Sequence, residues 1–140
     1  MNQLFIKFSR YILILYCKWT ELTYALNSLQ PRLLFNECEI WSCHLGIGIG
    51  DEQMGVGDEF LRPVVIIKKF NNHLCSIVPL TKTIKYSKYY YIFEFIPGQS
   101  SAAILSQNRS IDAQRLNRMI GRIKRRDFNE LKKRLMNILS

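Results

Sequence analysis

The feature that most constrains the fold is a series of short apolar runs in the middle of the chain, each rich in β-branched and aromatic residues. Runs of this length and composition predict β-strands, and the Gly, Pro and Asn residues between them predict tight turns. In order, the runs are "CEIWSCHLG", "LRPVVIIKKF", "LCSIVPL", "KYYYIFEF" and "AAILSQ". We expect the third to end near Pro79 and "PGQSS" to form the turn before the fifth. Five short strands with tight turns predict a small barrel or a strongly bent sheet.

The N-terminal part of the chain is predicted to be a helical extension. Its apolar residues recur at helical spacing and form one stripe, which consists of Phe5, Phe8, Ile12, Leu15, Trp19, Leu22, Leu26 and Leu29. The first half of this stripe fits a strand equally well by composition, and Pro31 ends the helical pattern. The run at 11–17 is far shorter than the roughly 20 residues that span a bilayer, and no signal-peptide cleavage site follows it. We therefore expect residues 1–36 to pack on a domain formed by residues 37–140.

The C-terminal part is also predicted to be helical. After Asp112, apolar residues again recur at helical spacing, at Leu116, Met119, Ile120 and Ile123. Asp127, followed three residues later by Glu130, fits a capping box. A second stripe then follows, formed by Phe128, Leu131, Leu135 and Ile138. This pattern predicts helices at the C-terminal end, so the expected class is mainly β with helices at both ends.

Charge is unevenly distributed along the 140 residues, a length typical of one domain. The net charge of +9 favours a polyanionic partner, chiefly nucleic acid, although a basic surface also serves solubility. Residues 34–61 contain acids but no Lys or Arg, whereas residues 115–134 are strongly basic, and the basic stretch fits phosphate binding and a solvated helix face equally well. The four cysteines lack CxxC spacing, which favours a reducing, cytoplasmic setting.

The segment "LGIGIGDEQMGVGDEFLRPVVII" admits three interpretations: a phosphate-binding glycine loop, an acidic metal site, or a loop followed by a functional arginine. The glycines form GxGxG, not the GxGxxG of a dinucleotide site, and no GK[ST] is present. Gln53 and Gly55 break the EF-hand spacing, so we expect no metal. A mobile loop between strands remains, and Arg62 directly follows it at the start of an apolar strand. Thr81 has a similar position at the end of the next strand, where a threonine is more often a turn residue.

These segments together resemble a known family. "EIWSCHLGIGIGDEQMGVGDEFLRPVVIIKKF", then "IVPLT", then "AAILSQNRSIDAQRLNRMIGRI" are similar, in order and spacing, to the MazF/PemK toxins of bacterial type II toxin–antitoxin systems. The resemblance covers residues 38–123, and more loosely 18–140. It implies a small SH3-like β-barrel, usually a homodimer, and an mRNA interferase-like endoribonuclease that cleaves single-stranded RNA without metal or other cofactor. Three features depart from the family: Asn108 replaces a usual apolar residue, the glycine loop is longer than in the smallest members, and the N-terminal forty residues are an addition to them.

The resemblance also implies roles for individual residues. Arg62 falls on the family's catalytic arginine, and Thr81 falls on its catalytic threonine or serine. On chemical grounds Glu52 is the better general base, because a guanidinium rarely gives up its proton. The RNA-binding candidates beside them are Gln53, Gln107, Arg109 and His44. Of these, Gln107 and Arg109 fit RNA contacts or structural supports, and a lone histidine such as His44 is more often a structural residue.

Three functions remain as alternatives. The first is the ribonuclease, with a cognate antitoxin as protein partner and with operator DNA bound only indirectly through that antitoxin. The second is a non-catalytic toxin that binds a protein target such as gyrase, because gyrase-inhibiting toxins share this barrel. The third is a domain that only pairs with its antitoxin. None of the three requires a membrane partner.

Overall fold

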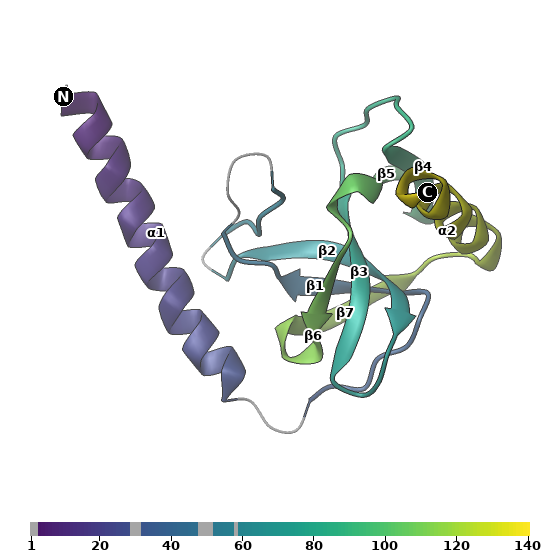
Figure 1. Ribbon diagram of the computed structural model, residues 1–140, viewed down its shortest axis with the longest axis horizontal. Coiled ribbons are helices and arrows are strands. Elements are labelled where there is room, and N and C mark those ends of the chain that lie inside the picture. The colour runs from purple at the N-terminus through teal and green to yellow at the C-terminus, as the bar shows by residue number, and fades with distance from the viewer. Residues whose placement is uncertain (1–2, 29–31, 48–51, 58) are drawn as a thin grey trace.

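The computed structural model describes residues 3–28, 32–47, 52–57 and 59–140, with side chains from residue 10 onward. The elements are α1 (Gln3–Asn27), β1 (Glu39–His44), β2 (Leu61–Lys69), β3 (Leu74–Thr81), β4 (Tyr90–Ile96), β5 (Gln99–Ile104), η1 (Leu105–Gln107), β6 (Arg109–Asp112), η2 (Ala113–Arg115), β7 (Leu116–Arg122) and α2 (Arg125–Leu139). The strands form one antiparallel sheet in the order β4-β5-β3-β2-β1-β7, and β6 pairs with β3 (Figure 1). The prediction of a mainly β chain with helices at both ends is confirmed.

Strand β3 organises the centre of this sheet. One of its edges pairs with β2, while the other pairs with β6 along residues 74–77 and with β5 at Leu80 and Thr81. Pro79 lies between these two partners on that edge, while its other edge pairs with Val64 of β2. The strand continues two residues beyond Pro79 and ends at Thr81, which confirms the expected position of Thr81 at the end of this strand.

The hydrogen-bonded sheet is open. Within the described part of the chain, no pairing joins its two end strands, β4 and β7, so the predicted SH3-like barrel is not confirmed. The two strands nevertheless approach closely, because a Cβ on Gly121 of β7 would lie 2.8 Å from the Phe95 ring of β4. Glycine at this position permits the strong bend that brings the end strands together.

Buried side chains form two clusters, one on each face of the sheet. The first contains α2 residues packed on strand residues: Ile40, Val65, Ile67, Val78, Leu80, Phe93, Ala103, Leu105, Ile123, Phe128, Leu131 and Leu135. The second contains Phe35, Trp41, Cys43, Leu45, Val64, Ile66, Cys75, Ile77, Ile111, Ala113 and Leu116. Because alternate residues of a strand point to opposite faces, Arg62 and Thr81 continue the rows of the second cluster.

The helices lie on opposite sides of the sheet (Figure 1). On α1 the less exposed residues from residue 10 onward are Ile12, Leu15, Trp19, Leu22 and Leu26, which confirms that part of the predicted stripe. Leu29 and Pro31 and the side chains of Phe5 and Phe8 lie outside the described residues. The alternative of a strand at the start of this segment is wrong, since α1 is one continuous helix. No helix among the described residues is long and apolar enough to cross a membrane.

The largest error concerns the residues after Asp112, which were expected to begin the helical end, whereas residues 116–122 form β7. Residues 109–112, for which no element was predicted, form β6. The reason for this error lies in the pairing of β7 with β1. The register of this pair shifts twice, between Ile40 and Trp41 and between Ser42 and Cys43. Each extra residue in a bulged strand interrupts the alternation of faces. The apolar residues of β7 therefore recur at intervals that imitate a helix, while the free edge of β1 supplies the backbone partners that decide the outcome.

Two predicted ends also need correction. Gln99 belongs to β5, so "PGQSS" contributes only Pro97 and Gly98 to the turn. The predicted capping box is wrong, because α2 begins at Arg125 after Lys124, whose side chain makes no capping bond. Asp127 instead lies in the first turn and accepts a hydrogen bond of 2.8 Å from the Tyr91 hydroxyl. The apolar stripe of α2 is confirmed, and it is the single helix after β7.

Candidate functional site

Arg62 occupies the second position of β2, directly after the β1–β2 loop, which we define as residues 45–60. Its Nε donates to the carbonyl of Met54 at 2.8 Å, and one terminal nitrogen donates to the carbonyl of Leu80 at 3.3 Å. The first contact ties the guanidinium to the loop, and the second ties it to β3. The side chain is half-buried, and burial lowers the pKa of the guanidinium from its ordinary value. These contacts hold a planar cation at the edge of the sheet.

Thr81 is the last residue of β3 and lies next to Arg62 across the sheet. Val64 pairs with Pro79 and Val65 pairs with Val78, so the same register extended by two residues sets Arg62 opposite Thr81. The Thr81 hydroxyl oxygen accepts a hydrogen bond of 3.1 Å from the backbone N–H of Thr83. This is the local turn contact expected of a strand-end threonine. It uses an acceptor position and leaves the hydroxyl hydrogen available for donation.

The β1–β2 loop carries two further predicted residues. The backbone N–H of Gln53 donates to the side-chain Oε1 of Gln107 at 3.5 Å, which connects the loop to η1. Glu52 precedes it and has an exposed side chain. Since Met54 binds Arg62 and Gln53 contacts Gln107, the loop touches both the predicted catalytic arginine and η1. Glu52 belongs to the same loop, two residues before Met54.

The other two RNA-binding candidates differ in position. Arg109 begins β6, is exposed, and pairs with Ile77, so it lies on the same face of the sheet as Arg62 and Thr81. His44 ends β1, and its side chain is on the opposite face of the sheet from that of Arg62, because Arg62 pairs with the neighbouring residue Cys43. Its side chain is only 5% exposed, and Nδ1 lies 2.6 Å from the carbonyl of Glu59. Because a carbonyl only accepts, Nδ1 carries the proton, and His44 has the contacts of a residue that supports the loop.

Sequence reasoning missed Arg115, which it grouped with the basic C-terminal stretch. One of its terminal nitrogens donates to the carbonyls of His44 at 3.2 Å and Leu45 at 3.5 Å. Burial lowers the pKa of the Arg115 guanidinium, and the nearby charge of Arg109 acts in the same direction. No local pattern distinguishes this arginine from its neighbours, because its partners are backbone atoms distant in sequence. The Met54 carbonyl that binds Arg62 is also a backbone atom, so no residue type marks this contact in the sequence.

The described residues contain no group of side chains that could hold a metal ion. No group of three or more His, Cys, Asp or Glu side chains lies together there, while Asp51 and Asp58, candidates for an acidic cation site, lie outside that part of the chain. The four cysteines are free thiols, and Cys43 and Cys75 are buried.

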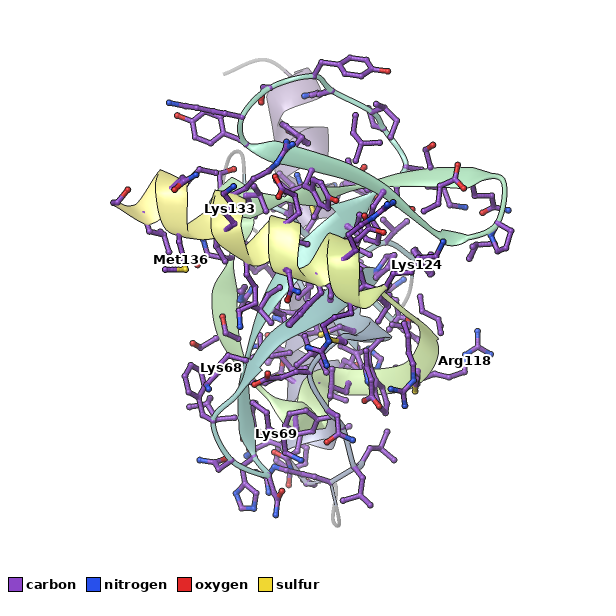
Figure 2. All side chains as sticks on the ribbon, turned by 90° about the vertical axis from the view of Figure 1, so that its right-hand side faces the viewer. Lys68, Lys69, Arg118, Lys124, Lys133 and Met136 are labelled. Carbon is purple, nitrogen blue, oxygen red and sulfur yellow. The ribbon has the colours of Figure 1, made fainter. Side chains whose placement is uncertain are left out.

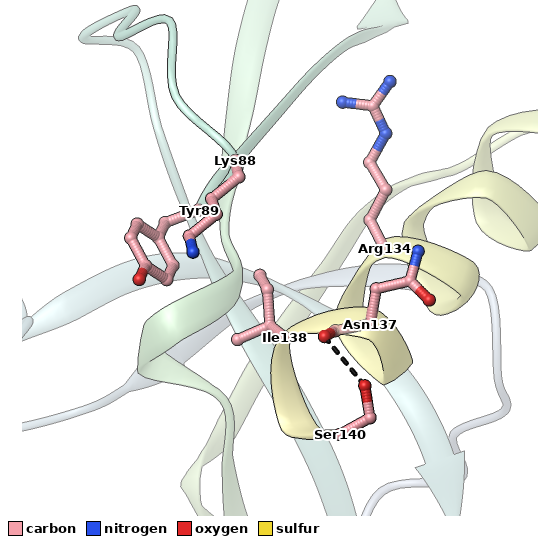
Figure 3. Close-up of a pocket in the computed structure, with 6 residues that line it drawn as sticks. All are labelled: Lys88, Tyr89, Arg134, Asn137, Ile138 and Ser140. Carbon is pink, nitrogen blue, oxygen red and sulfur yellow. Dashed lines mark hydrogen bonds between the residues drawn. The ribbon is translucent and has the colours of Figure 1, made fainter.

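Most of the basic stretch belongs to β7 and α2. Figure 2 shows Lys133 on α2, Lys124 just before this helix and Arg118 on β7, with Lys68 and Lys69 at the end of β2. A pocket of about 370 Å³ lies at the C-terminal end of α2 (Figure 3). It is lined by Lys88, Tyr89, Arg134, Asn137, Ile138 and Ser140, none of which is a predicted site residue.

The fold defines a class of protein, because solved MazF toxins share this architecture. MazF from Deinococcus radiodurans aligns with a TM-score of 0.60 and 16% identity, covering 76% of this chain and 97% of its own. The Mycobacterium tuberculosis toxin MazF-mt6 aligns with a TM-score of 0.56 and 17% identity, covering 72% and 95%. An endoribonuclease from a mycobacterial species, solved in complex with its cognate antitoxin, gives 0.58 and 14%, covering 74% and 92%. At such identities the likeness establishes the fold.

The family follows from a match in sequence. Residues 36–139 match the family described as PemK-like, MazF-like toxins of type II toxin–antitoxin systems. This match spans most of the chain, so the chain belongs to that family. No curated protein shows a significant sequence match to the chain. Residues 1–35, including α1, lie outside the family match.

Proposed function

We propose that this chain is the toxin of a type II toxin–antitoxin system and acts as a metal-independent endoribonuclease on single-stranded RNA. The observation that carries the proposal is the Arg62 guanidinium, held beside Thr81 at the edge of the sheet by two backbone carbonyls. A planar cation next to a hydroxyl group suits a phosphate, because both supply hydrogen bonds to its oxygens. Membership of the toxin family supports the same conclusion.

In the proposed reaction, the 2′-hydroxyl of one nucleotide attacks the adjacent phosphorus atom. The P–O bond to the 5′-oxygen of the next nucleotide breaks, which leaves a 2′,3′-cyclic phosphate and a 5′-hydroxyl. The base takes the proton of the attacking hydroxyl, and an acid returns a proton to the leaving oxygen. Because the nucleophile is the 2′-hydroxyl, DNA is not a substrate.

Each predicted residue receives one role. Arg62 stabilises the charge that develops on the phosphorus centre, and the Thr81 hydroxyl donates to a non-bridging oxygen. Glu52 acts as the base that accepts the 2′-hydroxyl proton, since a carboxylate accepts a proton far more readily than a guanidinium releases one. The Met54 carbonyl holds Nε and the Leu80 carbonyl holds one terminal N–H, so the remaining terminal N–H groups are left to bind the phosphate.

The remaining candidates fit contacts along the RNA strand. Gln53 and Gln107 are joined by a weak bond of 3.5 Å, which a nucleotide can replace with contacts of its own. Arg109 is exposed on the same face and suits a flanking phosphate. His44 then acts on RNA only through the loop that its ring supports at Glu59.

The proposed partners follow from the family. A cognate antitoxin binds the toxin and blocks the site, and operator DNA is bound only through that antitoxin. Two of the structures with this fold are a MazE–MazF complex and an endoribonuclease with its antitoxin. We further propose a homodimer in the cytoplasm, with residues 37–140 as the toxin domain in an SH3-like barrel arrangement and residues 1–36 as an extension packed on it.

The test is to incubate the full-length protein with a long single-stranded RNA and to sequence the new ends. We expect discrete cuts with 5′-hydroxyl ends, unchanged by EDTA, and no cuts in DNA of the same sequence. Loss of activity with EDTA would contradict the metal-free mechanism. Toxicity on induction without any RNA cleavage would instead support a toxin that binds a protein target such as gyrase.

A further inference from the structure

Helix α1 lies outside the family match, yet it contacts the base of the β1–β2 loop. We propose that α1 is a positioning element for this loop and that Trp19 is the residue through which it acts. The loop stem is defined here as Leu45, Gly46, Gly55 and Phe60. The inference rests on the proposed function, because the loop precedes Arg62 and carries Glu52.

Backbone hydrogen bonds hold the two ends of the loop together at this stem. The N–H groups of Leu45 and Gly46 donate to the carbonyl of Phe60 at 3.0 and 3.5 Å, and the N–H of Gly55 donates to the carbonyl of Gly46 at 2.8 Å. A Cβ on Gly55 would overlap the backbone of Phe60. The stem is therefore closely packed and has no space for a larger residue at Gly55.

Trp19 contacts both ends of the loop at once. Gly46 has φ of +80°, and a Cβ there would overlap the Trp19 indole ring, so the ring lies directly against the Gly46 backbone. The edge of the same ring meets the Phe60 ring with centroids 5.4 Å apart. On the other side, the Arg115 guanidinium lies 5.4 Å from the indole while it donates to the carbonyls of His44 and Leu45. One side chain of α1 thus packs between the loop stem and an arginine that binds the end of β1.

The loop stem is only one residue away from the carbonyl group that binds Arg62. Met54 directly precedes Gly55, and its carbonyl accepts the hydrogen bond from Arg62 Nε at 2.8 Å. Movement of Gly55 therefore moves the group that orients the catalytic guanidinium. The stem held by Trp19 thus fixes the Met54 carbonyl, and with it the orientation of the guanidinium toward the phosphate.

The C-terminal half of α1 is itself attached to the sheet. Leu26 is buried, and the carbonyl of Asn27 accepts from Gln114 Nε2 at 3.4 Å. After the helix, Arg32 forms a bidentate ion pair with Asp112 at 2.9 and 3.1 Å. These contacts keep the Trp19 turn of the helix against the loop, so α1 can act as a support.

The test compares Trp19→Ala with Trp19→Phe, and the matched control is Tyr24→Ala, since Tyr24 lies on the same helix and is 78% exposed. Steady-state RNA cleavage at varied substrate concentration gives kcat and KM separately, and hydrogen exchange at the amides of Leu45 and Gly55 reports on the stem without RNA. Thermal melting and circular dichroism verify that α1 and the sheet remain folded.

We expect Trp19→Ala to lower kcat about 10- to 100-fold with a change in KM below about threefold, because small displacements of catalytic groups have such costs. We expect exchange at the two stem amides to become about tenfold faster, because their packing is lost. Trp19→Phe retains an aromatic ring against Phe60 and should remain within about threefold of the parent, as should Tyr24→Ala.

Unchanged exchange at the stem in Trp19→Ala would overturn the inference, whether or not the parent cleaves RNA. Equal losses of kcat in Trp19→Ala and Tyr24→Ala would also overturn it, because they would indicate a general effect of the helix. If the parent cleaves no RNA but the stem amides exchange faster in Trp19→Ala, the support by α1 holds and the proposed catalysis fails. The two ideas can therefore fail separately.

Discussion

Replacing Arg62 tests the proposed chemistry most directly, through Arg62→Ala and Arg62→Lys. A guanidinium has five N–H donors, and the carbonyls of Met54 and Leu80 each accept one bond from it. These contacts fix the plane of the group, so its other donors can meet two phosphate oxygens together. Lysine keeps the charge but has no fork, and it can satisfy either the carbonyls or the phosphate geometry, not both.

The magnitude follows from the number of donors lost. Removing one transition-state donor costs about 2.7–4 kcal/mol, or about 100- to 1000-fold in rate. Two phosphate contacts that act as a unit are not additive, so we expect Arg62→Ala to lower kcat/KM by about 10³- to 10⁵-fold. For Arg62→Lys we expect about 10²-fold, because the charge remains and the bidentate geometry is lost.

The fold should survive both changes. Arg62→Ala removes a half-buried side chain and leaves two carbonyls, whose lost hydrogen bonds cost about 0.5–1.5 kcal/mol each. Urea unfolding should therefore show a small loss of stability beside a large loss of activity. Arg118→Ala is the matched control, since Arg118 is an exposed arginine of β7.

The assay is single-turnover cleavage of a short fluorogenic RNA that contains one site mapped with the parent protein. The same RNA with a 2′-deoxy nucleotide at that site measures the background. Cleavage by Arg62→Ala within threefold of the parent would refute the proposed role of the arginine. Equal rates for Arg62→Lys and the parent would refute the argument that the planar fork is needed. A role for the positive charge alone would remain.

Three further outcomes are expected. Thr81→Val should reduce cleavage about 100-fold in the same assay, because it removes the hydroxyl donor and keeps the shape. Leu131→Ala should cost about 2–5 kcal/mol in urea unfolding because Leu131 is fully buried, whereas Leu139→Ala, at a residue 66% exposed, should change little. Burial raises the pKa of the Cys43 thiol to about 12, so mass spectrometry after brief alkylation at pH 8 should find exposed Cys17 modified and Cys43 unmodified.

Local sequence predicted the strands whose alternation is undisturbed. The runs that became β1, β2 and β3 contain β-branched residues with turn residues between them, and they supply about half of the residues in the two buried clusters. Strand β7 was missed because its two register shifts against β1 hide the alternation. The capping box of α2 failed because Asp127 binds Tyr91, a partner that no local pattern identifies.

For the candidate site, the sequence predicted which residues belong to it but not the contacts that orient them. The order and spacing of Arg62, Thr81 and Gln107 identified the residues, and the register of β2 with β3 brings the first two together. The contacts that hold Arg62 come from the carbonyls of Met54 and Leu80, and every residue type offers a carbonyl. Such contacts carry no signature in the sequence, which explains why the orientation of the arginine emerges only in three dimensions.

The glycines of the β1–β2 loop show that glycine content alone does not predict how tightly the loop is packed. Their density suggested a mobile loop, because glycine tolerates positive φ and adds backbone freedom. Gly57 fits that interpretation, with φ of +79° and no atom near a Cβ position. Gly46 and Gly55 do the opposite, because their missing side chains allow Trp19 and the Phe60 backbone to pack against the chain. At these two positions glycine makes the stem tighter, so a loop that is rich in glycine has a closely packed base next to Arg62.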